Sequence, residues 1–448
     1  MMVYKEDSDG NAVYDWSCID EIFDFFREVN IKPFVEIGFM PENLASKKQY
    51  ASFLWRPNVS YPKSIQKWRT LIGEFLNHYI QRYGKEEVEK WYFEMWCSPD
   101  IPDVYWFESK DSFFKFYKET YFAIKEVSNN LKIGSPSVSP YNNFKWFSDF
   151  LNYCKDNYIE LDFVTSHIYS HVDATNESFL GEFLSIQTPK FSLADENFLH
   201  RSVVSMKQIL NESHLNSTKL FLTSWNLNLY AKDYTRDTCF LSSYILYNVL
   251  NNIDNIDGLA YWSLSDILEE KITENKLFHG GPGLFTRNGL KKPSFNAFFL
   301  LNKLGNNIIE RGRDYIITSK DKNIQILIYN FVYLDELFRR GDKSLLSYHN
   351  RYNVYQPAKN KSVDLLLTLE TGNYSIKRSR LTRDSGSSFD AWLKMGAPEN
   401  ISPDIYAFLK SRESPEISIT TESVKEQLLL SDSVPVHGVL LIEIDRVN

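Results

Sequence analysis

The stretch Lys90-Trp91-Tyr92-Phe93-Glu94-Met95-Trp96-Cys97-Ser98-Pro99-Asp100 decides the fold of this 448-residue chain. Its first half is a short apolar run typical of a buried strand. Its second half ends in Pro and Asp, which favour turns, so a loop follows the strand. A parallel barrel carries its functional side chains on loops of this kind, at the carboxyl ends of its strands. We therefore take residues 96–100 as the first candidate for a functional loop.

Other apolar runs alternate with segments of helical periodicity as far as about residue 300. The predicted strands cover residues 33–39, 90–96, 132–138, 162–169, 219–226 and 258–264. The predicted helices cover residues 17–29, 65–83, 112–131, 144–158, 200–212 and 237–250. This alternation predicts an α/β fold with a parallel sheet and crossover helices. Because the motifs fall at the carboxyl ends of the strands, a TIM-type (β/α)8 barrel is favoured over an open sheet.

The pattern changes after about residue 300. Short β-type runs at 315–318, 324–331, 363–369, 374–378, 417–419 and 439–444 are separated by turn residues and by two helical insertions, 389–395 and 405–410. These runs predict an antiparallel β-sandwich packed against the barrel. We therefore assign residues 1–300 to the barrel and residues 301–448 to the β-sandwich domain.

Five segments of the chain resemble family 39 glycoside hydrolases, the β-xylosidase and α-L-iduronidase group. They are residues 31–41, 91–100, 166–169, 261–270 and 278–281. The resemblance implies a TIM-type barrel that hydrolyses glycosides with two glutamates. One glutamate, the acid/base, corresponds to Ser98, and the other, the nucleophile, corresponds to Ser224.

The same resemblance implies that the barrel is incomplete. In the resembled enzymes the acid/base follows the fourth strand and the nucleophile lies on the seventh, whereas Ser98 and Ser224 belong to the second and fifth strands predicted here. A closed barrel needs eight strands, and residues 1–16 are predicted to form a loop. We expect two strands upstream of Met1, unless another element closes the barrel or the strands are in a different register. Six strands alone would expose apolar edges.

The two serines remove the chemistry of a retaining glycosidase. Such an enzyme needs two carboxyl groups about 5–5.5 Å apart, one to protonate the leaving oxygen and one to attack the anomeric carbon. The Ser98 hydroxyl cannot act as the acid. The loss of general acid catalysis alone lowers the rate by about 10²–10⁴-fold. Ser224 is a poor nucleophile without an adjacent base. Cys97 also replaces an asparagine that contacts the sugar 2-hydroxyl in the resembled enzymes.

Groups that bind sugar are better preserved. The resemblance and the strand-end positions indicate the substrate-binding residues Trp96, Cys97, His167, Tyr169, Asn226, Trp262, Glu269, Glu270 and His279. His167 and Tyr169 share one strand face because side chains alternate along a strand. Trp262 can stack on a sugar ring, although a packed core position is the competing interpretation. For Asp100 we favour a solvated loop position, for Glu94 a buried barrel position, and for Glu36 a structural role.

Composition limits the possible partners. The net charge of −8 argues against nucleic-acid binding by this surface. The cysteines Cys18, Cys97, Cys154 and Cys239 are widely spaced and give no metal-ligand pattern. We therefore predict a reduced cytoplasmic protein with no metal and no cofactor. No apolar run approaches the roughly 18 residues of a membrane span, so no membrane contact is expected.

The resemblance extends to AraC-type transcription regulators that carry a helix-turn-helix region followed by a family 39-like module. Residues 281–286 and 383–396 are similar to that subgroup. We therefore expect an inactive module that binds a carbohydrate as the sensor of a regulator. A homodimer is one possible assembly, and DNA would be bound only by a module outside this sequence. Two rivals stay open. One is a working glycosidase that uses relocated carboxylates, Asp100 and Glu269. The other is a purely structural dimerisation module.

Overall fold

A computed structural model describes residues 3–51, 53–101, 104–140, 144–172, 192–230, 232–268 and 276–447. Its first part is a curled, parallel six-stranded sheet in the order β10-β9-β6-β5-β4-β3. The strands are β3 (Phe34–Ile37), β4 (Tyr92–Met95), β5 (Lys132–Val138), β6 (Phe163–Tyr169), β9 (Lys219–Asn226) and β10 (Gly258–Tyr261). These are the six predicted strands, shortened at some ends, and they confirm the α/β class and the incomplete barrel.

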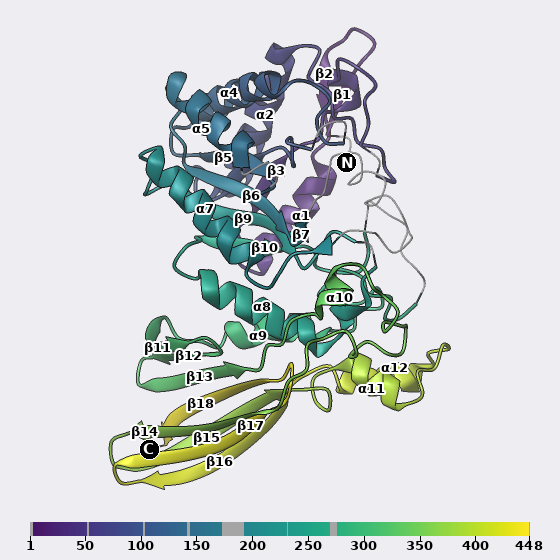
Figure 1. The fold of residues 1–448 in the computed structure, drawn as a ribbon. Coiled ribbons are helices and arrows are strands. Elements are labelled where there is room, and N and C mark those ends of the chain that lie inside the picture. The colour runs from purple at the N-terminus through teal and green to yellow at the C-terminus, as the bar shows by residue number, and fades with distance from the viewer. Residues whose placement is uncertain are drawn as a thin grey trace.

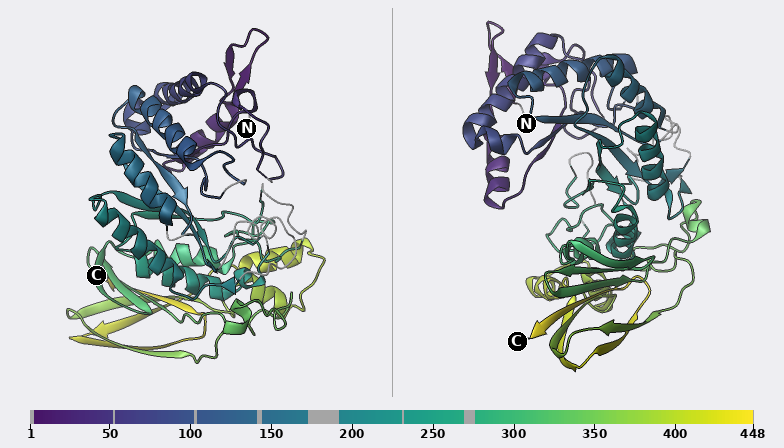
Figure 2. Two further views of the ribbon diagram at one scale, coloured as in Figure 1. Left: turned by 45° about the horizontal axis from the view of Figure 1, so that its top comes forward. Right: turned by 90° about the vertical axis from the view of Figure 1, so that its left-hand side faces the viewer.

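Helices cover the outer face of the curled sheet, as the two views of Figure 2 show. They are α1 (Ser17–Glu28), α2 (Ile65–Tyr83), α3 (Lys85–Val88), α4 (Lys110–Val127), α5 (Lys145–Asp156), α7 (Phe198–Glu212), α8 (Cys239–Asn252) and α9 (Pro293–Leu301). Serine side chains cap α2 and α4, each accepting a hydrogen bond from a backbone N–H group in the first turn of its helix. These caps fix where the two helices begin. Helix α8 is buried on almost all sides because it lies between the parallel sheet and the second part of the molecule (Figure 1).

Side chains on the inner face of the sheet form layers because they alternate along each strand. The layer at the amino ends is aromatic: Phe34, Tyr92, Phe163 and Phe221 pack with ring centroids 5.1–5.6 Å apart. Gly134 leaves room for this layer, since a Cβ there would lie 2.4 Å from the Phe163 ring. The aromatic layer closes one end of the half-barrel, so a pocket can open only toward the carboxyl ends of the strands.

The second part is a β-sandwich, as predicted. One sheet has the order β11-β12-β13-β18-β15-β16 and faces the two-stranded sheet β14-β17 (Figure 1). The strands are β11 (Asn307–Gly312), β12 (Tyr315–Lys320), β13 (Asn323–Tyr329), β14 (Lys361–Thr368), β15 (Gly372–Leu381), β16 (Glu416–Val424), β17 (Gln427–Val434) and β18 (Val439–Val447). Buried aliphatic residues such as Ile376, Leu428 and Ile442 fill the space between the sheets.

One hydrophobic core continues from the barrel into the sandwich, where Phe240 of α8 packs on Tyr355 and on other aromatic rings. Short helices lie beside it: α10 (Glu336–Arg339), α11 (Ser388–Lys394) and α12 (Pro403–Ser411). The division into domains at residue 300 stays a prediction. Helix α9 ends at Leu301 and β11 begins at Asn307.

The amino-terminal segment differs from the prediction. Residues 1–16 were expected to form a loop, but β1 (Tyr4–Glu6) and β2 (Ala12–Tyr14) pair as an antiparallel hairpin. The Asp7 carboxylate stabilises the turn by accepting hydrogen bonds from two of its backbone N–H groups. Short elements of this kind also include β7 (His171–Val172), β8 (Ser192–Leu193), η1 (Glu42–Leu44) and η3 (Tyr234–Asp237). The two edges of the parallel sheet, β3 and β10, expose large apolar side chains nearby, including Phe34 and Leu264, as expected for an open barrel.

Candidate functional site

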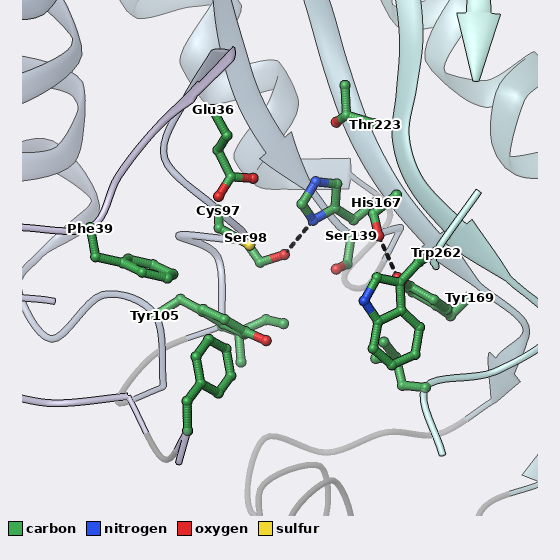
Figure 3. Close-up of a pocket in the computed structure, with 14 residues that line it drawn as sticks. Glu36, Phe39, Cys97, Ser98, Tyr105, Ser139, His167, Tyr169, Thr223 and Trp262 are labelled. Carbon is green, nitrogen blue, oxygen red and sulfur yellow. Dashed lines mark hydrogen bonds between the residues drawn. The ribbon is translucent and has the colours of Figure 1, made fainter. Parts of the chain in front are cut away.

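A pocket of about 230 Å³ opens at the carboxyl ends of the parallel strands. Figure 3 shows its side chains converging from β3, β6 and β9 and from the loops that follow β4, β5 and β10. It is lined by Glu36, Phe39, Phe53, Cys97, Ser98, Ile101, Tyr105, Ser139, His167, Tyr169, Thr223, Ser224, Leu229 and Trp262. The structure therefore brings together both predicted catalytic positions, Ser98 and Ser224, and four of the predicted binding residues.

Ser98 is held against a histidine. Its hydroxyl oxygen lies 2.8 Å from Nδ1 of His167, and both side chains are 95% buried (Figure 3). The Ser98 backbone has a positive φ of 41°, and its N–H donates to the hydroxyl of Ser137. Burial lowers the pKa of His167 to about 4, so the imidazole is neutral near pH 7. Ser98 and His167 form a neutral hydrogen-bonded pair.

Ser224 is paired with a tyrosine. Its hydroxyl forms a short hydrogen bond with the phenol of Tyr169, which comes from the neighbouring strand β6 (Figure 3). In the register of the two strands His167 lies opposite Ser224 and Tyr169 lies opposite Asn226, so the bond between Tyr169 and Ser224 runs diagonally across the strand pair. Both predicted catalytic positions thus carry a neutral hydroxyl, and each hydroxyl is hydrogen-bonded to an aromatic side chain of strand β6.

The opposite wall of the pocket is built on Trp262. Its ring lies edge-on to Tyr169, with centroids 6.1 Å apart. Asn226 does not line the pocket; it is buried and donates from Nδ2 to the backbone carbonyl of Trp262 at 2.5 Å. Asn226 therefore acts by positioning the tryptophan. An aromatic face beside several hydroxyl groups is an arrangement that can hold a sugar ring.

The other four predicted binding residues lie elsewhere or outside the described part of the chain. Trp96 is fully buried, donates from its indole to the Tyr105 carbonyl at 2.6 Å and packs on Phe39 and Trp106, so it supports the pocket from behind. His279 is also buried and does not line the pocket. Glu269 and Glu270 lie outside the described residues.

Three carboxylates lie on or behind the pocket wall. Glu36 is exposed and lines the pocket, so its expected structural role is not its only one. Glu94 is buried, as expected. Asp100 was expected to be solvated, but its carboxylate is enclosed: Oδ2 accepts the Ser139 N–H at 2.9 Å and Oδ1 is buried without a described partner. Burial raises the pKa of Asp100 to about 7.

Sequence reasoning missed several lining residues, among them Phe39, Tyr105, Ser139, Thr223 and Leu229. Ser139 follows β5 directly, and Phe39 follows β3 after one glycine. The rule that parallel strands present functional groups at their carboxyl ends would have indicated both. Tyr105 and Leu229 lie in long loops, and nothing in the sequence marks the direction of such side chains.

Comparison with known proteins gives a direct result. The profile described as Glycosyl hydrolases family 39 matches residues 1–426. The chain belongs to glycosyl hydrolase family 39. A β-xylosidase of Geobacillus stearothermophilus is 30% identical over 452 residues, which cover 100% of this chain and 84% of that protein. A β-xylosidase of Caldicellulosiruptor saccharolyticus is 29% identical over 99% of this chain and 86% of that protein.

Solved structures agree with the family. The crystal structure of a monomeric β-xylosidase from Caulobacter crescentus CB15 has a TM-score of 0.87 and 26% identity, covering 100% of this chain and 87% of that one. More distantly, an uncharacterized HTH-type transcriptional regulator of Staphylococcus aureus is 23% identical over 62% of this chain and 36% of its own length. The similarity to regulators therefore covers part of the family 39 fold.

Two positions of this family 39 chain carry hydroxyl groups where the resemblance implies the catalytic glutamates. A retaining mechanism requires one carboxyl group that protonates the leaving oxygen and another that attacks carbon. At the two positions that correspond by resemblance, Ser98 and Ser224 offer hydroxyl groups, and their hydrogen-bond partners are the imidazole of His167 and the phenol of Tyr169. These four groups can donate and accept hydrogen bonds to a polyhydroxylated ligand, and none of them is a carboxyl group.

Proposed function

We propose that this chain is a catalytically inactive family 39 module that binds a carbohydrate. The observation that carries the proposal is the pair of serines in one pocket, each hydrogen-bonded to an aromatic side chain; the family resemblance assigns these two positions to the catalytic glutamates. The remaining lining fits a sugar: hydroxyls and an imidazole for its polar edge, and Trp262, Phe39 and Tyr105 for its apolar face.

We further propose that the module is the sensor of a cytoplasmic transcription regulator. The partial similarity to HTH-type regulators supports this role. DNA would then be bound by a module outside this sequence, and pairing of two copies of this chain is the expected assembly. Among the described residues, no helix is both long and apolar enough to cross a membrane.

A second candidate function is glycoside hydrolysis by relocated carboxylates, and Asp100 favours it. Its pKa of about 7 would let it act as a general acid near neutral pH. The similar proteins from Geobacillus and Caldicellulosiruptor are named β-xylosidases. Asp100 is not a lining residue, however, and its partner in this scheme, Glu269, lies outside the described part of the chain.

Two measurements separate these functions. Calorimetry against pentoses, hexoses and uronic acids should give sugar-dependent heat that is weakened by Trp262→Ala. Incubation with an aryl β-xyloside should give no release of the aryl group above a Ser98→Ala/Ser224→Ala control. Turnover that is lost in Asp100→Asn would replace the binding proposal with the hydrolase. If no sugar gives heat and no substrate is cleaved, the module is structural.

A further inference from the structure

Two carboxylates occupy matched positions in the layer between the aromatic layer and the pocket floor. Glu36 of β3 lies directly opposite Glu94 of β4 in the parallel register, one step above the pair Phe34 and Tyr92. Like charges directly opposite one another in a sheet repel. A positive charge between them would turn this repulsion into attraction.

A histidine completes the group. One ring nitrogen of His167 and one carboxylate oxygen from each of Glu36 and Glu94 lie within 4.8 Å of one another. Nδ1 of His167 is bonded to Ser98, whereas Nε2 is buried and has no hydrogen-bond partner among the described residues. A buried polar atom without a partner is uncommon and calls for a ligand.

We propose that Glu36, Glu94 and His167 bind a divalent transition-metal cation such as Zn²⁺ or Mn²⁺. Bonds of about 2.0–2.2 Å to one ion place two ligand atoms up to about 4.4 Å apart, so small side-chain adjustments suffice. An imidazole in the set favours these ions over Ca²⁺ and Mg²⁺, which prefer oxygen ligands alone. Three protein ligands leave a position open toward the pocket, where water or a sugar hydroxyl can bind.

The surroundings hold two of the ligands in place. Thr223 donates from Oγ1 to Oε1 of Glu94 at 2.8 Å, which orients that carboxylate. Ser98 lies 2.8 Å from Nδ1 of His167. When Nδ1 carries the proton and donates to Ser98, the lone pair of Nε2 is available for the cation, the usual arrangement of a metal-binding histidine. Glu36 is exposed, so the site can exchange its ion with solvent.

The burial of Glu94 supports the proposal. This side chain is only 2% exposed, and a bound cation compensates a carboxylate for the loss of its water. The proposal does not depend on sugar binding, since the ion would be held by the three side chains whether or not a sugar occupies the pocket.

Metal binding is tested with the full chain, stripped with a chelator and titrated with ZnCl₂ or MnCl₂ by calorimetry, with elemental analysis after dialysis. We expect one ion per chain, and affinity reduced about tenfold or more in Glu94→Gln and Glu36→Gln. Ser98→Ala should weaken binding by a smaller factor. Glu399→Gln, at an exposed site in the sandwich, and Cys97→Ser serve as controls and should bind as the wild type does.

Two results would overturn the proposal: no ion is retained by the wild-type chain, or Glu94→Gln and Glu36→Gln both bind the ion with wild-type affinity. Binding lost only in Cys97→Ser would assign the ion to the thiol and also reject the proposed ligands. Glu36→Gln changes an exposed side chain and should not affect folding, so it remains informative if Glu94→Gln is unstable.

Discussion

A buried ion cluster joins the barrel to the connection between β13 and β14 of the sandwich, and replacing its lysine should destabilise the chain. Lys292 contacts Asp237 and Asp266, both at 2.8 Å, and Arg351 contacts Asp237 at 2.6 Å. All four side chains are fully buried. Among the described residues, Lys292→Met therefore leaves Asp266 without an ion-pair partner and Asp237 with Arg351 alone. Breaking a buried ion pair in this way costs about 3–5 kcal/mol.

The expected fall in melting temperature follows from the size of the chain. An unfolding entropy of about 2.1 cal/mol/K per residue gives about 0.9 kcal/mol/K for 448 residues. The fall is therefore about 3–5 °C if the chain unfolds in one transition, and larger if a smaller unit unfolds by itself. Differential scanning calorimetry measures it, with Lys115→Met on the exposed face of α4 as the matched control.

The pH dependence and a second variant identify the cause. Burial already raises the pKa of Asp266, and loss of Lys292 should raise it further. The difference between variant and wild type should then shrink as pH falls, because a protonated Asp266 needs no cation. Lys292→Met/Asp266→Asn should recover part of the loss. A melting temperature within about 1 °C of wild type, or no recovery in the double variant, would refute the argument.

Three further predictions concern the pocket. The double variant Ser98→Glu/Ser224→Glu restores both carboxylates and should raise aryl β-xyloside hydrolysis by about 10² or more over the wild type. Each single variant should gain little, since both catalytic roles are needed. Equal activity in a single variant and in the double variant would contradict this. Trp262→Ala should weaken sugar binding by about 1.5–3 kcal/mol, which is a loss of affinity of roughly tenfold or more. Calorimetry measures this loss, and the control Trp146→Ala on α5 should bind the sugar as the wild type does. The wild type should lose stability as pH rises from about 4 to 8, because the buried Asp100, with a folded pKa of about 7, must then ionise inside the protein. Asp100→Asn does not titrate, so its stability relative to wild type should rise over the same range, by up to about 4 kcal/mol. Asp156→Asn at an exposed site is its control, and a difference that stays constant with pH would show that Asp100 is not the group responsible.

The parallel strands were predictable because each is a short apolar run between helical segments. Strand β11 was missed because its side chains are exposed throughout and show no alternation. Strand β17 was missed because exposed Leu429 between the buried Leu428 and Leu430 hides the alternation in the sequence. The turn from β4 explains the error in placing Trp96. Its positive φ of 67° directs the indole toward Trp106 and Phe116 rather than into the pocket. A family motif identifies such a residue but not the side on which it packs.

The cross-strand pair of Glu36 and Glu94 shows a second limit. Each glutamate alone reads as an ordinary residue of a strand, and the sequence predicts no metal site. Only the register between β3 and β4 places them side by side, and only the curl of the sheet brings His167 of β6 across to them. Sites built by strands far apart in the chain depend on register, and register is set by packing of the whole sheet.

The serine at position 98 also affects the protonation of His167. A carboxylate bonded to His167 would favour the imidazolium ion and raise its pKa. With a hydroxyl in that place, desolvation is the cause that remains, and it lowers the pKa to about 4. His167 then stays neutral, with one nitrogen bonded to Ser98 and the other turned to the layer of Glu36 and Glu94. Where the family resemblance expects a glutamate, Ser98 thus leaves a neutral imidazole, the form that our proposals require for binding a cation or a sugar hydroxyl.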